Sequence, residues 1–253
     1  MRPVLIFLLL SACSQPSPPE PQPASPCIRE RFEESTFTVC DPDGGKVEIR
    51  TGHRSFASLQ AALGDRAKNV AFAMNGGMFD DQGRPIGLMI EDGHQVHAIN
   101  RREGGGNFHL MPNGVFLVRE DGRAEVVESS AYKPSRTIQF ATQSGPMLLI
   151  HGKLHPRFER DGQSRYVRNG VGIAGNGKLL FVISESAVSF GKMARFLRDS
   201  HQVRDALFFD GSVSSLWNPA NSRMDSFTEL GPMVVVFKPP AESKPGRANR
   251  ARP

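Results

Sequence analysis

The sequence predicts an α+β fold: a single domain with a large mixed β-sheet and few helices. Its 253 residues are 39% hydrophobic and 23% charged, which suits a globular protein and excludes the disordered and collagen-like classes. Between Phe37 and Lys238, short apolar runs alternate with Gly, Asn and Asp turns, the pattern of consecutive strands. Two segments show helical spacing, and neither a long linker nor a change in composition indicates a second domain.

The predicted strands are the apolar runs between turn residues. In chain order they cover residues 36–40, 46–50, 70–74, 87–91, 114–119, 124–127, 139–142, 147–150, 171–174, 178–184, 206–209 and 233–237. The first predicted helix, residues 55–63, begins at a Ser cap and has apolar residues at helical spacing. The second covers residues 189–200 and shows the same spacing.

The N-terminus is typical of a secretory signal, because Arg2 precedes a short apolar run and small residues. The run is too short for a transmembrane helix, which needs about 20 apolar residues. Leu-Ser-Ala-Cys, ending at Cys13, resembles the bacterial lipobox. It predicts a lipoprotein signal peptide over residues 1–12 and lipidation of Cys13, with an ordinary signal peptide cut elsewhere as the alternative. By resemblance to sorting in enteric bacteria, Ser14 after the cysteine favours the outer membrane.

Residues 13–26 are predicted to form a tether, because six prolines between Gln15 and Pro26 favour polyproline II and cannot build a core. Two or more acyl chains on Cys13 would hold the domain stably at the membrane of the cell envelope. The domain itself is then expected over residues 27–238. A flexible basic tail is expected over residues 239–253.

The net charge of +5 does not indicate nucleic-acid binding. Removing Arg2 and the tail, which carries a net +3, leaves about +1 for the domain. The aromatic residues, 8% of the chain, are not interleaved with basic residues in the way that stacks bases.

Cys27 and Cys40 lie near the start of the domain, in a compartment expected to be oxidising. We therefore expect them to form a disulfide. A reactive thiol is the alternative.

Polar residues follow the ends of three apolar runs, where loops held by a sheet often carry function. The first is Asn75-Gly76-Gly77, whose backbone N–H groups could hold an anion. The second is Arg168, just before a glycine-bearing strand; its planar fork matches phosphate or carboxylate oxygens. A plain turn and a surface arginine are the respective alternatives.

The third run ends at Asp210, followed by Gly211, Ser212, Val213, Ser214 and Ser215. A carboxylate there could act as nucleophile, base or metal ligand, with nearby hydroxyls as hydrogen-bond donors. An Asx turn at the strand end is the alternative.

Together these stretches resemble the phosphodiester glycosidase family over about residues 72–236. The matching residues are Asn75-Gly76-Gly77-Met78-Phe79, Pro85-Ile86-Gly87-Leu88, Ser144-Gly145-Pro146-Met147-Leu148, Arg168 with Val171-Gly172-Ile173, the 191–197 helix, and Asp210-Gly211 with Ser214-Ser215. The chain departs from the family pattern at Asn169, where a Thr is frequent, and at Ser212 and Val213, where glycines are frequent.

The resemblance implies hydrolysis of the glycosidic bond of a sugar-1-phosphodiester, for example an N-acetylglucosamine-1-phosphodiester, in cell-envelope glycan metabolism. It implies Arg168 as the phosphate clamp and Asp210 as nucleophile or base. Asn75, Gly76, Gly77, Gly211, Ser212, Ser214 and Ser215 are expected to contact substrate. Glu185, at the end of a predicted strand, is the reserve catalytic carboxylate or a structural residue.

The alternative from another class is a non-catalytic envelope lipoprotein that binds phosphate-linked glycans. No cofactor or metal site is expected, since no His-Glu-x-x-His or Cys-x-x-Cys spacing occurs, although a divalent cation near Asp210 stays open. His94 and His97 would face opposite sides of one strand. His151 and His155 flank a turn and are expected to be solvated.

Overall fold

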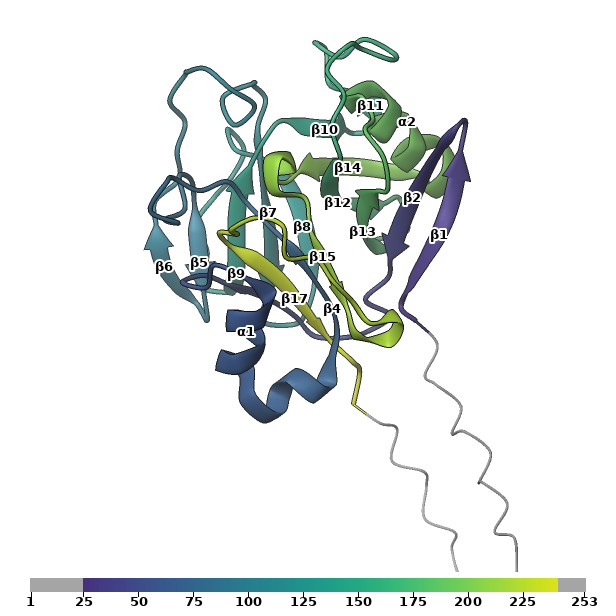
Figure 1. Ribbon diagram of the computed structural model, residues 1–253. Helices are drawn as coiled ribbons and strands as arrows, with labels where there is room; N and C mark the ends of the chain where they lie inside the picture. The colour runs from purple at the N-terminus through teal and green to yellow at the C-terminus, as the bar shows by residue number, and fades with distance from the viewer. Residues whose placement is uncertain (1–24, 241–253) are drawn as a thin grey trace, which may run out of the picture.

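The computed structural model describes residues 25–240, which form an α+β domain with three antiparallel sheets (Figure 1). The first sheet has seven strands in the order β1 (Cys27–Phe32), β2 (Ser35–Cys40), β13 (Leu179–Ser184), β12 (Asn169–Ala174), β14 (Val203–Phe208), β10 (Met147–Ile150) and β11 (Lys153–Leu154). The second has five in the order β16 (Arg223–Met224), β15 (Leu216–Asn218), β4 (Val70–Asn75), β17 (Met233–Phe237) and β3 (Val47–Arg50). The third has five in the order β6 (His94–His97), β5 (Met89–Glu91), β9 (Ile138–Ser144), β7 (Gly114–Arg119) and β8 (Ala124–Glu128).

The predicted α+β class, with one domain and few helices, is confirmed. The strands differ from the expected single mixed sheet, because they divide among three sheets with antiparallel pairing. Short, twisted strands in this number curl or split into separate sheets, which buries their apolar faces against one another.

One aromatic cluster joins the three sheets and explains why they form a single domain. Phe181 of β13 packs edge-to-face against Phe72 of β4 and against Phe116 of β7, with ring centroids 5.6 Å apart in both pairs. All three side chains are fully buried. Because each ring belongs to a different sheet, no sheet can be removed without exposing the core of the other two.

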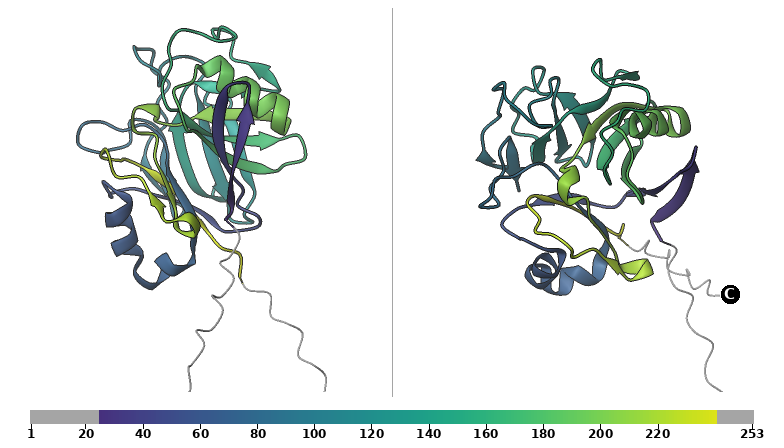
Figure 2. Two further views of the ribbon diagram at one scale, coloured as in Figure 1. Left: turned by 45° about the vertical axis from the view of Figure 1, so that its right-hand side comes forward. Right: turned by 45° about the horizontal axis from the view of Figure 1, so that its top comes forward.

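Helix α2 (Phe190–His201) covers one face of the first sheet (Figure 2). Ser189 caps it by accepting a hydrogen bond from the backbone N–H of Lys192. Phe196 stacks on Phe37 of β2 with ring centroids 4.1 Å apart. Helix α1 (Phe56–Leu63) buries Phe56 and Leu59 in a cluster with β4 and β17 of the second sheet.

Residues 25–240 also contain three short 3₁₀ turns: η1 (Gly64–Asn69), η2 (Gly211–Val213) and η3 (Pro219–Asn221). The chain crosses from the first sheet to the second through η2, between β14 and β15. The end of β14, the end of β4 and the start of β12 meet at this crossing. The three stretches singled out in the sequence therefore come together.

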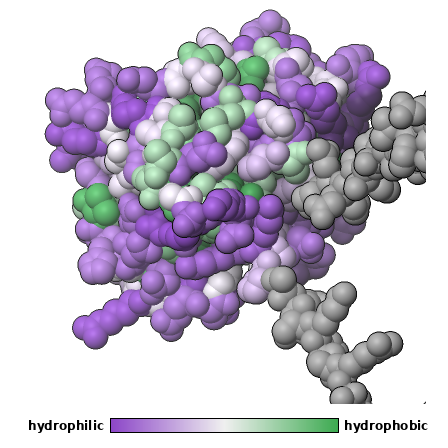
Figure 3. Space-filling view, turned by 60° about the horizontal axis from the view of Figure 1, so that its bottom comes forward, coloured by the Kyte–Doolittle hydropathy of each residue, from purple (hydrophilic) through white to green (hydrophobic). Residues whose placement is uncertain are grey.

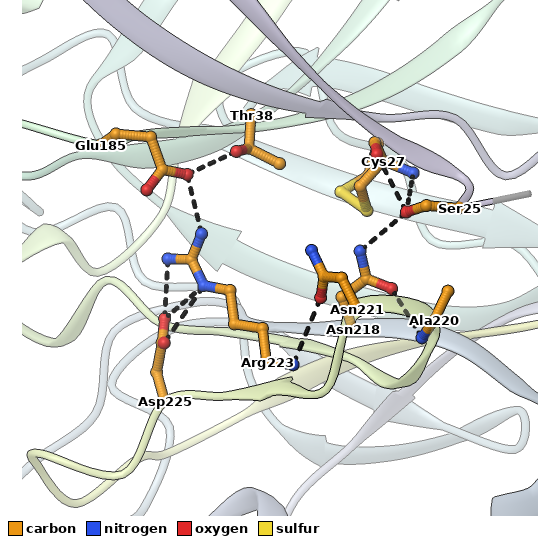
Figure 4. Close-up of a disulfide and its surroundings, with 10 residues drawn as sticks. Ser25, Cys27, Thr38, Glu185, Asn218, Ala220, Asn221, Arg223 and Asp225 are labelled. Carbon is orange, nitrogen blue, oxygen red and sulfur yellow. Dashed lines mark hydrogen bonds and ion pairs between the residues drawn. A yellow bond between two sulfur atoms is a disulfide. The ribbon is translucent and has the colours of Figure 1, made fainter.

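The predicted disulfide between Cys27 and Cys40 is confirmed and joins β1 to β2 at paired positions (Figure 4). The predicted signal peptide, Cys13, most of the predicted tether and most of the predicted basic tail lie outside the described residues. Both ends of the described chain leave on one side of the domain, where the surface is largely hydrophilic around a small apolar strip (Figures 1 and 3). Within residues 25–240 no helix is long and apolar enough to cross a membrane.

Candidate active site

Asn75, at the end of β4, is the centre of a buried hydrogen-bond network that joins the three strand ends. Its Nδ2 donates to the Asp210 carbonyl at 2.7 Å, and its Oδ1 accepts from Asn169 Nδ2 at 2.9 Å and from the Ser215 N–H at 2.8 Å. The side chain is 1% exposed. Each polar atom of the Asn75 amide thus has a partner, which fixes the loop after β14 to both sheets.

Asn75→Ala is expected to lower the free energy of unfolding by about 3 kcal/mol, because it leaves buried donors and acceptors of three segments without partners. Chemical denaturation measures this change. Asn221→Ala is the matched control, since Asn221 is exposed and accepts one local hydrogen bond, from the Arg223 N–H. A loss below about 1 kcal/mol for Asn75→Ala would contradict a central role for this network.

Asp210 follows β14 and is half-buried. Its Oδ1 accepts hydrogen bonds from the Ser212 hydroxyl at 2.6 Å and the Ser212 N–H at 3.2 Å. Burial raises the pKa of the Asp210 carboxyl, and the two bonds from Ser212 oppose this rise. A partly buried carboxyl with a raised pKa is a candidate for acid–base or nucleophilic chemistry.

Arg168 precedes β12 and is 1% exposed. The β12–β14 pairing ends at Gly170 and Phe208, so the main chains of Arg168 and Asp210 lie at the same end of these two strands. Its guanidinium lies against the Phe190 ring, 3.5 Å from the centroid, and donates from Nε to the Val188 carbonyl at 2.9 Å.

The other hydrogen bonds of the guanidinium go to Ser164, whose carbonyl and hydroxyl oxygens accept from Nη2 at 3.0 and 3.2 Å. None of the carboxylates in residues 25–240 forms an ion pair with it. Burial therefore lowers the pKa of Arg168 to about 10. A buried cation without a counter-ion is costly, and an anionic ligand would remove that cost.

A cavity of about 390 Å³ adjoins the Arg168 contacts. Ser164, Ser189, Phe190, Phe158 and Asn107 are among its lining residues. Its volume is within the usual range for small-ligand pockets. A larger cavity of about 680 Å³ lies near the chain ends. None of the predicted site residues lines either of these two cavities.

Comparison with known proteins identifies the family. A family model described as phosphodiester glycosidase matches residues 68–237. The chain belongs to the phosphodiester glycosidase family. It is also 39% identical over 186 residues to the uncharacterized protein YigE of Escherichia coli, a match that covers 72% of each chain.

Two solved structures share the fold of this family member. One is the catalytic domain of zebrafish N-acetylglucosamine-1-phosphodiester alpha-N-acetylglucosaminidase, auto-inhibited by its pro-peptide, with a TM-score of 0.58 and 17% identity over 85% of this chain and 82% of that chain. The other is a hypothetical protein from Synechocystis, with a TM-score of 0.54 and 12% identity over 84% of this chain and 61% of that chain. At these identities the likeness concerns the fold.

In this phosphodiester glycosidase family member, two of the three Asn75-Gly76-Gly77 N–H groups are used within the protein. The Asn75 N–H donates to the Ser215 carbonyl at 3.3 Å and the Gly76 N–H to the Pro232 carbonyl at 2.7 Å. The expectation that these two groups are free to hold an anion is therefore wrong. Gly77 allows close packing, since a Cβ there would lie 2.2 Å from Thr142 Oγ1.

Ser214 and Ser215 are buried and hold the loop after β14. The Ser214 hydroxyl donates to Asn169 Oδ1 and to the Val167 carbonyl, both at 3.1 Å, and the Ser215 hydroxyl donates to the Val213 carbonyl at 2.7 Å. Gly211 packs against Phe208, where a Cβ would lie 2.2 Å from the ring. Contact of these residues with substrate stays a prediction.

Glu185 belongs to a different group of side chains (Figure 4). It accepts hydrogen bonds from Thr38 and from Arg223 Nη1, the latter at 2.7 Å, and Arg223 also pairs with Asp225. Burial tends to raise the pKa of Glu185, but the bonds from Thr38 and Arg223 outweigh it and lower that pKa. These contacts give Glu185 a structural ion pair, and its reserve catalytic role stays a prediction.

The histidines divide between surface and core. His94 and His97 lie on the exposed strand β6, and His151 is exposed. His155, expected to be solvated, is instead 1% exposed and stacks on Phe158, 4.7 Å between centroids. The expectation is wrong because the ring is covered by Phe158, which in turn stacks on Phe190 of α2. Within residues 25–240 no three His, Cys, Asp or Glu side chains are grouped to hold a metal ion.

The sequence did not indicate the residues that enclose Arg168. Ser164 belongs to a polar stretch without a motif, and Phe190 was recognised as an apolar position of the second helix alone. The isolated bridge between Tyr166 and Val188 brings these segments together. The sequence does show that Phe190 is an apolar residue next to the Ser189 cap. It does not show that the Phe190 ring covers Arg168.

Proposed function

We propose that the protein hydrolyses the glycosidic bond of a sugar-1-phosphodiester, with N-acetylglucosamine-1-phosphodiesters as the first candidates, in cell-envelope glycan metabolism. The observation that carries the proposal is Arg168: a buried guanidinium without a carboxylate partner, directly before β12, at the end of the sheet where β14 leads to Asp210. Membership of the phosphodiester glycosidase family supports the same reaction. The zebrafish enzyme of similar fold is named for such a substrate.

One carboxylate is chemically sufficient for this reaction. Most glycosidases need a second carboxyl to protonate an alkoxide leaving group. Here the bond between the anomeric carbon and the bridging oxygen breaks, and its electron pair leaves on a phosphate monoester, which has a second pKa of about 6 and departs without an acid. Water supplies the hydroxyl at the anomeric carbon, and its proton passes through Asp210 to solvent.

Arg168 would balance the charge on the phosphate. In the structure the Ser164 carbonyl and hydroxyl oxygens accept hydrogen bonds from Arg168 Nη2. Phosphate oxygens would take the positions of these two oxygens. The polar segment of residues 156–166, most of which is exposed, must therefore move before substrate binds. Asp210 then acts as nucleophile or as base at the anomeric carbon.

Release of free sugar tests the proposal. The domain from Cys27 onward is incubated with UDP-N-acetylglucosamine and with methyl- and mannose-linked N-acetylglucosamine-1-phosphodiesters. We expect turnover of at least one substrate by the native protein and none by Arg168→Ala. Saturable binding of these compounds by a folded protein, with no product over hours, would instead indicate a glycan-binding lipoprotein.

We also propose that the protein is lipid-anchored through Cys13, in the outer membrane. The support is the lipobox and the position of the chain ends, which leave the domain on the side away from η2 (Figure 1). An anchored domain would then hold Asp210 away from the lipid surface. Metabolic labelling with a fatty acid, compared between the full chain and Cys13→Ala, tests this proposal.

A further inference from the structure

The turn that carries Asp210 is fixed at both ends. Gly211 packs on the Phe208 ring, and Val213 is 8% exposed in the cluster that contains Phe56 and Trp217. Ser212, between them, is exposed. Because its neighbours are held by packing, the Ser212 side chain has a defined place over the carboxylate.

The two carboxylate oxygens of Asp210 differ in their surroundings. Oδ1 accepts both bonds from Ser212, through the hydroxyl at 2.6 Å and the N–H at 3.2 Å. Among the described residues no donor reaches Oδ2. Ser212 thus holds the carboxyl group through Oδ1. Oδ2 can contact a reacting group.

We propose that Ser212 is a positioning residue, whose hydroxyl holds Oδ1 of Asp210 and keeps the carboxylate in its reactive, ionised form. The proposal rests on the proposed function for the reaction in which Asp210 acts. This role differs from the contact with substrate that was expected from the sequence for Ser212. The Ser212 hydroxyl acts through Asp210.

The groups around Asp210 support this assignment. Asn75, the last residue of β4, and the following Gly76 bond to the Asp210 backbone, and Asn169 begins β12 at the same end of the sheet. Arg168, directly before β12, is the charged residue on this side, and its guanidinium donates to Val188 and Ser164. Asp210 itself has no ion pair in residues 25–240. The hydroxyl of Ser212 is therefore the main group that offsets burial of the charge.

The direction of the effect follows from these contacts. Burial raises the pKa of Asp210 and the bonds from Ser212 lower it, so removal of the hydroxyl raises it further. Ser212→Ala keeps the backbone N–H bond and loses the stronger hydroxyl bond. We expect the Asp210 midpoint to rise by about one pH unit. Since the ionised form reacts, the acid limb of the pH–rate profile moves to higher pH by the same amount.

Carboxyl ¹³C NMR of protein labelled at aspartate measures the midpoint without any substrate, with Asp210→Asn to assign the signal. Ser212→Ala and Ser212→Gly should both raise the midpoint, whereas Ser212→Thr, which keeps a hydroxyl, should restore it. Ser130→Ala is the matched control, since the exposed Ser130 hydroxyl donates in the same way to Glu128, two residues earlier. It should leave the Asp210 midpoint unchanged.

An unchanged midpoint in Ser212→Ala, or equal shifts in Ser212→Ala and Ser212→Thr, would overturn the positioning role. The result is separable from the fate of the proposed function. Shifted midpoints in a protein that releases no sugar from any phosphodiester would refute the reaction and leave the Ser212 contact established. Turnover with unshifted midpoints would refute the Ser212 role alone.

Discussion

Asp210→Asn is expected to lower kcat by about 1,000-fold or more while the protein stays folded. The amide cannot take a proton from water or attack the anomeric carbon. It can still accept the two bonds from Ser212 through its carbonyl oxygen, so the turn is preserved. Because burial disfavours the charged carboxylate, a neutral amide should not reduce the melting temperature.

Sugar release and thermal unfolding measure the two parts of this prediction. Asp205→Asn is the control: Asp205 is partly buried on the same strand, β14, and accepts a bond from the His151 N–H outside the site. Its kcat should stay close to that of the native protein. Full activity of Asp210→Asn would remove Asp210 from the mechanism, and loss of its fold would favour a structural Asx turn.

Arg168→Met is expected to lower kcat/KM for a phosphodiester by about 100-fold or more and to abolish stabilisation by phosphate. The native protein should gain melting temperature in inorganic phosphate, because an anion that binds the folded state stabilises it. Methionine fills similar space against Phe190 without a charge. The variant should fold, since it removes a cation that has no counter-ion.

Arg168→Lys sharpens this experiment, because lysine keeps the charge and loses the planar fork. We expect it to retain part of the phosphate response and little of the activity. Arg119→Met is the control, since Arg119 pairs with Glu125 on the third sheet. A phosphate response that persists in Arg168→Met would contradict the clamp and place the anion elsewhere.

The strands that the sequence predicted are those with one or both faces buried. All twelve predicted runs are present, and both helices begin within a residue of the expected caps. Five strands were missed: β6, His94–His97, is exposed along its whole length, β1 is largely exposed, and β11 and β16 have two residues each. The fifth, β15, is buried but has three residues and ends in a polar Asn. Pairing with a neighbour, which the pattern of a single segment does not contain, forms these strands.

The sequence predicted the part of the candidate site that consists of polar residues at the ends of strands. Asn75, Asn169 and the Asp210 carbonyl meet at one crossing of the chain, whereas the Arg168 guanidinium contacts Val188, Ser164 and Phe190. The sequence could not show that the Asn75 and Gly76 N–H groups are already bonded, because their acceptors, Ser215 and Pro232, lie more than a hundred residues away. The enclosure of Arg168 likewise depends on long-range packing.

The enclosed state of Arg168 has a kinetic consequence. The Ser164 oxygens accept hydrogen bonds from the guanidinium. In the proposed role of Arg168, an anion can therefore bind only after residues 156–166 have moved. The observed rate of phosphate binding should then rise with phosphate concentration and level off at the opening rate of this segment. Its apparent affinity should be weaker than that of the opened site by the fraction of time spent open. Substitutions that loosen residues 156–166 would accordingly speed binding without altering a single contact to the anion.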